Sequence, residues 1–300
     1  MQNGDKGANL KASIIIPCKN EGANVRMTVD SILAVMPDDG YEIIIVDDSS
    51  SDDCCLFLHE RAPDKKINII SSPGLGAARA RNLGAQEARG EYLVFCDAHI
   101  TVPEGWPENL LKAFLDPEVG AVSPAIASMD HPDRVGCGQT WNPSLETLWL
   151  PPSKIRNLTA VPLLPGGCLA VRAGVFRQVG GFDRGFIVWG YEDVELSLKL
   201  WLFGFKLYVN PSIIIEHRFR KKHPYPVKAD HVHYNLLRMA YSHFNNKRID
   251  KVIDLLETNP KLKKIIRSVI QEGAMKQRVD YFSRRKYDDD WFMSRFNIKF

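Results

Sequence analysis

Short apolar runs alternate with segments of helical periodicity through the first third of the chain. Each run is about as long as a buried strand and ends at a polar or turn-forming residue. The pattern predicts strands at 12–16, 41–46, 67–70 and 91–96, and helices at 24–35, 52–61 and 76–88. Strands that alternate with helices favour a parallel sheet covered by helices on both faces.

The middle of the chain is less regular. Residues 123–165 are rich in Pro and Gly and include Trp141 and Trp149. This composition predicts loops and edge strands that form the wall of a pocket. A helix is then expected to open at Glu192, because an apolar stripe at helical spacing follows it.

The last third of the chain is predicted to become mainly helical. Its pattern predicts strands at 205–209 and 212–215, a basic loop at 218–228, helices at 229–246, 249–256 and 260–280, and an aromatic, charged tail at 284–300. The fold class expected from the whole pattern is α/β, with a mixed, mainly parallel sheet flanked by helices and a C-terminal helical extension.

Composition allows one large domain, or a domain with an appendage, since 45% of the 300 residues are apolar. The first residues show no secretory signal, and no apolar run approaches the roughly 20 residues that span a bilayer. None of the six cysteines stand in C-x-x-C spacing, so we expect reduced thiols and no structural zinc site. These features together predict a cytoplasmic protein.

Charge is distributed unevenly along the chain. Residues 1–217 hold 19 Lys/Arg and 27 Asp/Glu, a balance of −8, whereas residues 218–300 hold 20 and 9, a balance of +11. A basic C-terminal part could meet phosphate, a membrane surface or nucleic acid, or it could be a solvated helical surface. Among these we expect a peripheral membrane or protein contact and no nucleic-acid partner.

Polar residues follow the ends of four predicted strands. They are Pro17 with Glu21 close behind it, Asp48, Ser72, and the pair Asp97 and His99. In open sheets of this kind, ligands bind beyond the carboxyl ends of the strands. These strand ends therefore predict one shared crevice, with Pro17 and Glu21 among the residues beside its ligand.

Asp97 and His99 are candidate metal ligands. Residues i and i+2 of an extended strand point to the same side, so the two side chains should project together. His217, at the end of another apolar run, could be the third ligand. One carboxylate and two imidazoles suit Mn²⁺, Fe²⁺ or Zn²⁺. The alternatives are a strand end that meets water and a histidine satisfied inside the core.

Asp48 and Arg79 are candidate contacts to a nucleotide. A carboxylate at a strand end can accept hydrogen bonds from a base or a ribose. The Gly-rich turn at 74–76 precedes a helix and could hold an anion, and Arg79 could meet phosphate or sugar. The alternative for Asp48 is a residue that favours the start of the next helix through the helix dipole.

Glu192 and Asp193 are candidate catalytic carboxylates. Transfer of a group to a hydroxyl or thiol needs a general base that removes the acceptor's proton. Trp189 beside them could pack on a sugar ring or belong to the core. The simpler interpretation of the two acids is complementarity to the helix dipole.

The basic loop at 218–228 contains several cations beside the proposed metal ligand His217. Arg220, His223 and Tyr225 could clamp a diphosphate, and the prolines around them restrict the loop enough for it to act as a lid. A solvated basic loop is the alternative.

Several stretches carry a resemblance to a known family. SIIIPCKNE, EIIIVDDSSSDD and LVFCDAHI resemble family 2 glycosyltransferases of the GT-A fold, a Rossmann-like nucleotide-diphospho-sugar transferase fold. GLGAARARNLGA, FCDAHITVPEGW, VWGYEDVELSLKLWLFG and EHRFRKKHPYP resemble the catalytic domain of polypeptide N-acetylgalactosaminyltransferases. The resemblance covers about residues 12–245. It implies a catalytic domain at 1–228 that includes the lid, followed by the helical extension at 229–300.

The same resemblance implies roles for individual residues. It implies Mn²⁺ (or Mg²⁺) held by Asp97, His99 and His217 in a D-x-H form of the family's D-x-D motif. It also implies contacts to a UDP-sugar and its diphosphate from six residues: Asp48, Arg79, Trp189, Arg220, His223 and Tyr225.

The chain departs from the family in three ways. We expect neither the membrane anchor of the eukaryotic Golgi enzymes nor their C-terminal lectin domain. The family's Glu-Asn pair is Glu192-Asp193 here, a form typical of inverting enzymes, in which the Asp is the base. Asp193 is therefore the expected base, with inversion as the expected outcome.

The function that follows is a metal-dependent glycosyltransferase with a UDP-sugar donor and a peptide, glycan or small-molecule acceptor. Two alternatives stay open. One is a non-catalytic nucleotide-sugar-binding protein on the same fold. The other is a mononuclear iron oxygenase that uses the same three ligands, which the strand–helix alternation opposes.

Overall fold

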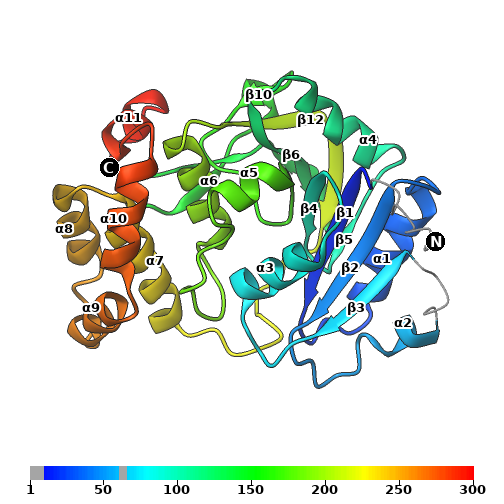
Figure 1. Ribbon diagram of the computed structural model, residues 1–300, viewed down its shortest axis with the longest axis horizontal. Coiled ribbons are helices and arrows are strands. Elements are labelled where there is room, and N and C mark those ends of the chain that lie inside the picture. Colours follow the sequence, from blue (N-terminus) through cyan, green and yellow to red (C-terminus); the bar gives the residue numbers. More distant parts are fainter. Residues whose placement is uncertain (1–9, 61–65) are drawn as a thin grey trace, which may run out of the picture.

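A mixed sheet with helices on both faces forms the body of the molecule (Figure 1). The computed structural model describes residues 10–60 and 66–300. Within these residues the strand order is β10-β12-β6-β11-β4-β1-β2-β3, with β5 beside β12 and β7 beside β6. The neighbours β3, β2, β1 and β4 run parallel, β11 is antiparallel to both of its neighbours, and β12 is parallel to β6. The predicted mixed, mainly parallel sheet is confirmed.

The strands have the following bounds: β1 Ala12–Cys18, β2 Tyr41–Asp47, β3 Ile67–Ser71, β4 Tyr92–Cys96, β5 Ile100–Thr101, β6 Val119–Ser128, β7 His131–Gly136, β8 Gln139–Trp141, β9 Thr147–Trp149, β10 Thr159–Ala160, β11 Cys168–Arg172 and β12 Lys206–His217. β8 and β9 pair with each other as a separate hairpin.

The helices have the following bounds: α1 Asn24–Val35, α2 Leu56–Glu60, α3 Ala77–Glu87, α4 Trp106–Leu111, α5 Ala173–Gln178, α6 Glu192–Leu202, α7 Ala229–His243, α8 Asn246–Leu255, α9 Leu262–Gln271, α10 Ala274–Arg284 and α11 Asp289–Arg295. Two short 3₁₀ turns lie at Lys112–Leu115 and Pro152–Lys154.

Each face of the sheet has its own core, because successive side chains of a strand point to opposite faces. Ile14 packs in the core that α1, α2 and α4 cover. Its neighbour Ile15 packs in the other core, with residues of α3, α5, α6 and the C-terminal helices. Because both faces of these strands are buried, their sequences are continuous apolar runs and do not alternate between apolar and polar residues.

Several elements differ from the prediction. The two strands expected at 205–209 and 212–215 are one strand, β12, whose pairing with β6 shifts register between Asn210 and Ile214. The helix expected at 260–280 is two helices, because Gly273 adopts a left-handed conformation (φ 85°) between them.

Helix α2 begins later than predicted, at Leu56, because Asp53 just before it has a positive φ of 53°. The region expected to hold only loops and edge strands also contains a central, wholly buried strand, β6. Pro124 in this strand stands opposite Asn210, at the register shift, where a strand tolerates the missing donor.

The C-terminal helices share the core of the sheet domain. Residues of α7, α8, α9 and α11 lie in the same buried cluster as β4, β11 and α6. The fully buried ammonium of Lys199 on α6 donates to Gly181 O (2.6 Å) and Glu195 (3.1 Å), and it lies 3.4 Å from the hydroxyl of Tyr281 on α10. Glu195 also contacts His243 of α7 at 2.8 Å. The expected helical extension is present, and its division from the catalytic domain at residue 228 stays a prediction.

In the part of the chain that the structure describes, no helix has both the length and the apolar character needed to cross a membrane.

Candidate active site

Two adjoining cavities open where the parallel strands end. The first, about 420 Å³, is lined by the loops after β1 and β2, the turn at 74–76 and α3. The second, about 760 Å³, lies among the ends of β4 and β12, the start of α6 and the β8–β9 hairpin. Four side chains line both cavities: Glu21, Arg81, Trp189 and Tyr225. The predicted crevice at the strand ends is therefore present.

Asp97, His99 and His217 converge on the second cavity. One ligand atom of each lies within 4.8 Å of the other two. Asp97 Oδ2 lies 3.2 Å from His217 Nε2 and 3.8 Å from His99 Nε2, and the two imidazole centroids are 4.7 Å apart. The three side chains predicted as ligands are thus brought together from two distant parts of the chain.

The local structure behind this convergence differs from the expected extended strand. Asp97 and His99 lie in a turn between β4 and β5, where the amide of Asp97 donates to Gly167 O. Antiparallel pairing of β5 with β12 sets Ile100 opposite His217. Gly167 allows this close packing, because a Cβ there would lie 3.0 Å from His217 Cδ2, a tighter contact than most Cβ atoms make.

The donor set fits a divalent transition-metal ion. It offers one carboxylate and two imidazoles, and His217 Nδ1 is buried without a hydrogen-bond partner. Burial alone would raise the pKa of Asp97, but the His217 hydrogen bond and the charge of Arg81 lower it overall. The carboxylate is therefore held in the ionised form that metal coordination requires.

Arg81 is a site residue that the sequence analysis missed. Its guanidinium is buried and donates to Asp97 Oδ1 at 2.7 Å and to Glu192 Oε1 at 3.3 Å. It thus ties the metal cluster to the start of α6. The sequence did hold a signal that could have identified Arg81. It stands three positions from both Ala78 and Gly84, which are small and buried, so it lies on the buried face of α3.

Glu192 and Asp193 open helix α6 and face the second cavity. Glu192 Oε2 accepts from the amide of Gly190 at 2.8 Å, and Asp193 Oδ2 accepts from the amide of Gly166 at 2.6 Å. Burial, only partly offset by Arg81, raises the pKa of Glu192 to about 7. Burial also raises the pKa of Asp193. Carboxyls with raised pKa values are suited to exchange protons near neutral pH.

The segment before α6 is held in an uncommon backbone conformation. Val188 and Tyr191 have positive φ values of 53° and 67°. The side chain of Asn235 on α7 fixes this segment, since its amide donates to the carbonyls of Ile187 and Gly190. Gly76 lies against it so closely that a Cβ would come within 2.9 Å of the Val188 backbone. The first cavity is thereby joined rigidly to the start of α6.

Asp48 lies in the wall of the first cavity, where its oxygens organise the Gly-rich turn. They accept from the Ser72 hydroxyl (2.6 Å) and from the amides of Leu75 (2.5 Å) and Gly76 (2.8 Å). Arg79 donates to Leu75 O at 2.8 Å and lines the same cavity, as does Pro17. These three residues stand where a nucleotide contact was predicted, and their contact with a ligand stays a prediction.

The basic loop folds over the junction of the two cavities. Arg220 Nη2 lies 2.8 Å from both Glu21 Oε1 and His99 Nδ1. The His223 ring lies 4.3 Å from the Trp189 ring and 5.8 Å from the Tyr225 ring, measured between centroids. The residues predicted as lid contacts are therefore all near the metal cluster or the shared wall of the cavities.

Comparison with family models gives two matches. Residues 13–180 match the model described as Glycosyl transferase family 2, and residues 158–224 match the model described as N-terminal domain of galactosyltransferase. The first match spans more than half of the chain.

Curated relatives match with about one residue in three identical. Polypeptide N-acetylgalactosaminyltransferase 12 of Mus musculus is 31% identical over 276 residues, which cover 82% of this chain and 48% of that protein. Probable N-acetylgalactosaminyltransferase 8 of Caenorhabditis elegans is 34% identical over 192 residues, which cover 59% of this chain and 46% of that protein. The chain spans about half the length of these relatives.

Solved structures match across nearly the whole chain. A crystal structure of GalNAc-T7 with UDP, GalNAc and Mn²⁺ superposes with a TM-score of 0.76 at 23% identity, over 96% of this chain and 57% of that one. A mannosyltransferase, PcManGT from Pyrobaculum calidifontis in complex with GDP-Man and Mn²⁺, gives a TM-score of 0.58 at 18% identity, over 97% and 84%. At these identities the likeness establishes the fold, which is the expected GT-A fold.

Proposed function

Because the chain belongs to glycosyl transferase family 2, we propose that it is a metal-dependent enzyme that transfers a sugar from a UDP-sugar to an acceptor hydroxyl or thiol. One observation carries the proposal. Asp97, His99 and His217 gather at the mouth of the strand-end crevice, and the carboxyl groups of Glu192 and Asp193 line the same cavity. A metal site and a general base are the two parts that such a transfer requires.

The donor is proposed to lie across both cavities. The nucleoside would occupy the first, beside Pro17, Asp48 and Arg79, and the diphosphate would reach Asp97, His99 and His217. A bound Mn²⁺ or Mg²⁺ would neutralise charge that builds on the departing UDP. The structural relatives named above with UDP or GDP-Man and Mn²⁺ support this choice of donor class and metal.

The chain's own residues would assist departure of UDP in two ways. Arg220 already lies beside Glu21 and His99, so its guanidinium can donate to a diphosphate oxygen. Tyr225 and His223 would cover the same group and exclude water. Burial raises the pKa of Tyr225, which keeps its phenol protonated and able to donate.

Asp193 is our proposed general base, with inversion at the sugar as the outcome. Its Oδ2 accepts only the amide of Gly166 among the contacts described, which leaves acceptor capacity toward the cavity. Glu192, in contrast, bridges Arg81 and Gly190 and would hold the segment in place. The anomeric configuration of the glycoside product, read by NMR and compared with that of the donor sugar, tests the assignment. A retained configuration would overturn it.

A peptide is the first acceptor to test, because the curated relatives are named polypeptide N-acetylgalactosaminyltransferases. Glycans and small molecules are the further candidates. The exposed side chains of Leu148 and Trp149 on the β8–β9 hairpin line the second cavity and could pack against an acceptor. Intact-mass analysis of a peptide library after incubation would identify a glycosylated product.

We also propose a cytosolic location and a second, electrostatic contact through the C-terminal helices. All six cysteines are free in the structure, which suits a reducing compartment. Exposed Lys263, Lys264 and Arg267 on α9 could meet an acidic protein or an anionic membrane surface. Sedimentation with anionic and with neutral vesicles tests the membrane contact, and thiol labelling in intact cells tests the location.

The decisive experiment is a screen of UDP-sugars with Mn²⁺ that measures UDP release. Turnover with one donor, lost on chelation and restored by Mn²⁺, is the expected result. A protein that binds UDP tightly but releases none with any acceptor or with water would be the non-catalytic sugar-nucleotide binder instead. Dioxygen uptake with 2-oxoglutarate would favour the iron oxygenase, which the mainly parallel sheet disfavours.

A further inference from the structure

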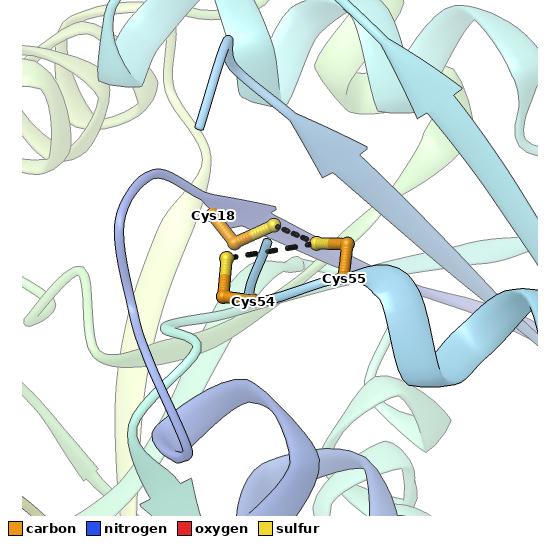
Figure 2. Close-up of side chains that lie close together, drawn as sticks. All are labelled: Cys18, Cys54 and Cys55. Atoms are coloured by element: carbon orange, nitrogen blue, oxygen red, sulfur yellow. Dashed lines mark hydrogen bonds between the residues drawn. The ribbon is translucent and has the colours of Figure 1, made fainter. Parts of the chain in front are cut away.

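Three cysteines from two distant segments form a cluster beside the first cavity (Figure 2). Cys18 ends strand β1, and Cys54 and Cys55 lie in the turn that leads into α2. Cys18 Sγ is 3.1 Å from Cys55 Sγ, and Cys54 Sγ is 3.8 Å from Cys55 Sγ. We propose that these three sulfurs form a binding site for one soft metal ion, separate from the site of Asp97.

The geometry meets the first requirement of a metal site, which is convergence. The three sulfurs lie within 4.8 Å of one another, and Figure 2 shows their side chains pointing toward a common centre. Each residue is at most 6% exposed, so the site is shielded from water. Spacing along the chain could not reveal this cluster, because parallel pairing of β1 with β2 is what brings Cys18 to the turn after β2.

The hydroxyl of Ser50 lies beside one of the three sulfurs. Cys54 Sγ lies 3.4 Å from the Ser50 hydroxyl. The thiolate is the form of cysteine that binds metals, so binding of an ion would release the thiol protons to solvent.

The ligand set selects the class of ion. Thiolates favour soft ions, such as Cu(I), over Mn²⁺ and Mg²⁺, which prefer oxygen ligands. Cu(I) is satisfied by three sulfurs, whereas Zn²⁺ in a structural site takes four ligands, and the described surroundings supply only these three sulfurs within 4.8 Å. Cu(I) is therefore the ion that this site fits best.

The cluster also joins the two loops that form the first cavity. The loop after β1 and the loop after β2 already exchange hydrogen bonds, from Asn20 N to Ser50 Oγ (3.1 Å) and from Ser51 N to Asn20 Oδ1 (2.7 Å). Cys18 itself lines the cavity. An ion bound by Cys18, Cys54 and Cys55 would link the loop after β1 to the loop after β2. Because it would bind only the folded chain, it would raise the thermal stability.

The test is an anaerobic titration of the reduced full-length chain, with Cu(I) and Zn²⁺ in separate arms, each against a chromogenic chelator. We expect one Cu(I) per chain, an ultraviolet thiolate-to-metal charge-transfer band, and a higher midpoint of thermal unfolding. Cys54→Ser and Cys55→Ser should each weaken Cu(I) binding by more than about 100-fold, beyond the roughly 10–100-fold typical of an outer-shell partner.

Two controls separate this site from other metal binding. Cys137→Ser changes a buried cysteine outside the cluster and should leave Cu(I) affinity unchanged. Asp97→Asn should also leave it unchanged, although it removes a ligand of the proposed Mn²⁺ site. The proposal is overturned if no stoichiometric Cu(I) binds, if Zn²⁺ alone binds, or if Cys137→Ser weakens binding as much as Cys54→Ser. A disulfide between cluster cysteines in protein isolated under reducing conditions would overturn it as well.

Discussion

Arg81 and Asp97 form a partly buried ion pair, with 2.7 Å between Nη2 and Oδ1, although Arg81 lies on helix α3 and Asp97 directly after strand β4. The same guanidinium reaches Glu192 Oε1 at 3.3 Å. One cation therefore compensates two carboxylates, of which one belongs to the metal cluster and the other to the start of α6. This arrangement makes the two halves of the site depend on a single side chain.

Replacement of Arg81 should destabilise the fold as well as the site. Arg81→Met leaves Asp97 and Glu192 without their cation, and loss of one partner of a buried pair costs about 3–5 kcal/mol. Urea denaturation monitored by circular dichroism measures the change. Arg177→Met, on the exposed face of α5, is the control and should stay within about 0.5 kcal/mol. Equal stability of the two variants would contradict the structural role of Arg81.

The metal ligands should control the dependence of turnover on Mn²⁺. His217→Ala and Asp97→Asn should each abolish stimulation by Mn²⁺ and lower turnover more than about 100-fold, since the ion contributes several kcal/mol to the transition state. UDP release at increasing Mn²⁺ concentration is the measurement. His131→Ala, an exposed histidine on β7, serves as the matched control. Full Mn²⁺ dependence in His217→Ala would remove His217 from the ligand set.

Replacement of Arg220 should lower kcat/KM for the donor more than it lowers the free energy of unfolding. Arg220→Ala removes a donor that lies beside Glu21 and His99, and charge-assisted hydrogen bonds contribute about 1.5–3 kcal/mol. We therefore expect kcat/KM for the donor to fall roughly 10- to 100-fold. Lys221→Ala in the same loop is exposed and does not line either cavity, so it should be close to wild type. A similar loss in both variants would indicate a general charge effect.

Glu192 should make the fold less stable as pH rises from about 4.5 to 7. Its pKa is raised from 4.5 to about 7, so between these values the folded state binds more protons than the unfolded state. The contribution of Glu192 to the free energy of unfolding is fully present below pH 4.5. It is lost as pH rises through 7, and the total loss is about 3 kcal/mol. Unfolding free energies from pH 4.5 to 8, measured with a chelator present, test this slope. Glu192→Gln should flatten it, and an unchanged slope would assign the titration to another group.

The C-terminal helices should be necessary for a stable sheet domain. Asp183 is buried in the segment before α6, and both of its carboxylate oxygens lie 2.9 Å from the Nε–H donor of Arg238 on α7. Asp183→Ala leaves that guanidinium without its carboxylate partner and should lower the unfolding free energy by about 3–5 kcal/mol. Asp280→Ala removes only an exposed pair with Arg284 and should cost less than about 1 kcal/mol. Thermal unfolding of both variants makes the comparison.

The apolar runs predicted the first four strands and their order of alternation with helices, because burial on both faces of a parallel sheet leaves a strong signal. Asp97 and His99 could be grouped from spacing alone, and His217 could be added because it ended another apolar run. The turn that in fact joins Asp97 to His99 could not be foreseen, because it depends on the amide of Asp97 reaching Gly167.

What the sequence could not give were relationships that only the sheet creates. Arg81 looked like one of several cations in a helix, and nothing in its neighbours marked it as the partner of both Asp97 and Glu192. Cys18 likewise meets Cys54 and Cys55 only after β1 and β2 pair. In the C-terminal part, the pattern predicts a single helix through Gly273, because helical periodicity continues on both sides of it.

The buried network around Lys199 limits which C-terminal helices can be exchanged between members of this family. Helix α6 begins with the proposed catalytic acids and continues with Glu195 and Lys199, whose partners His243 and Tyr281 come from α7 and α10. A chimera that kept this sheet domain but took its last helices from a relative without these two residues would leave the ammonium of Lys199 and the carboxylate of Glu195 without their partners. Domain grafting should therefore succeed only when the donor sequence supplies the same histidine and tyrosine.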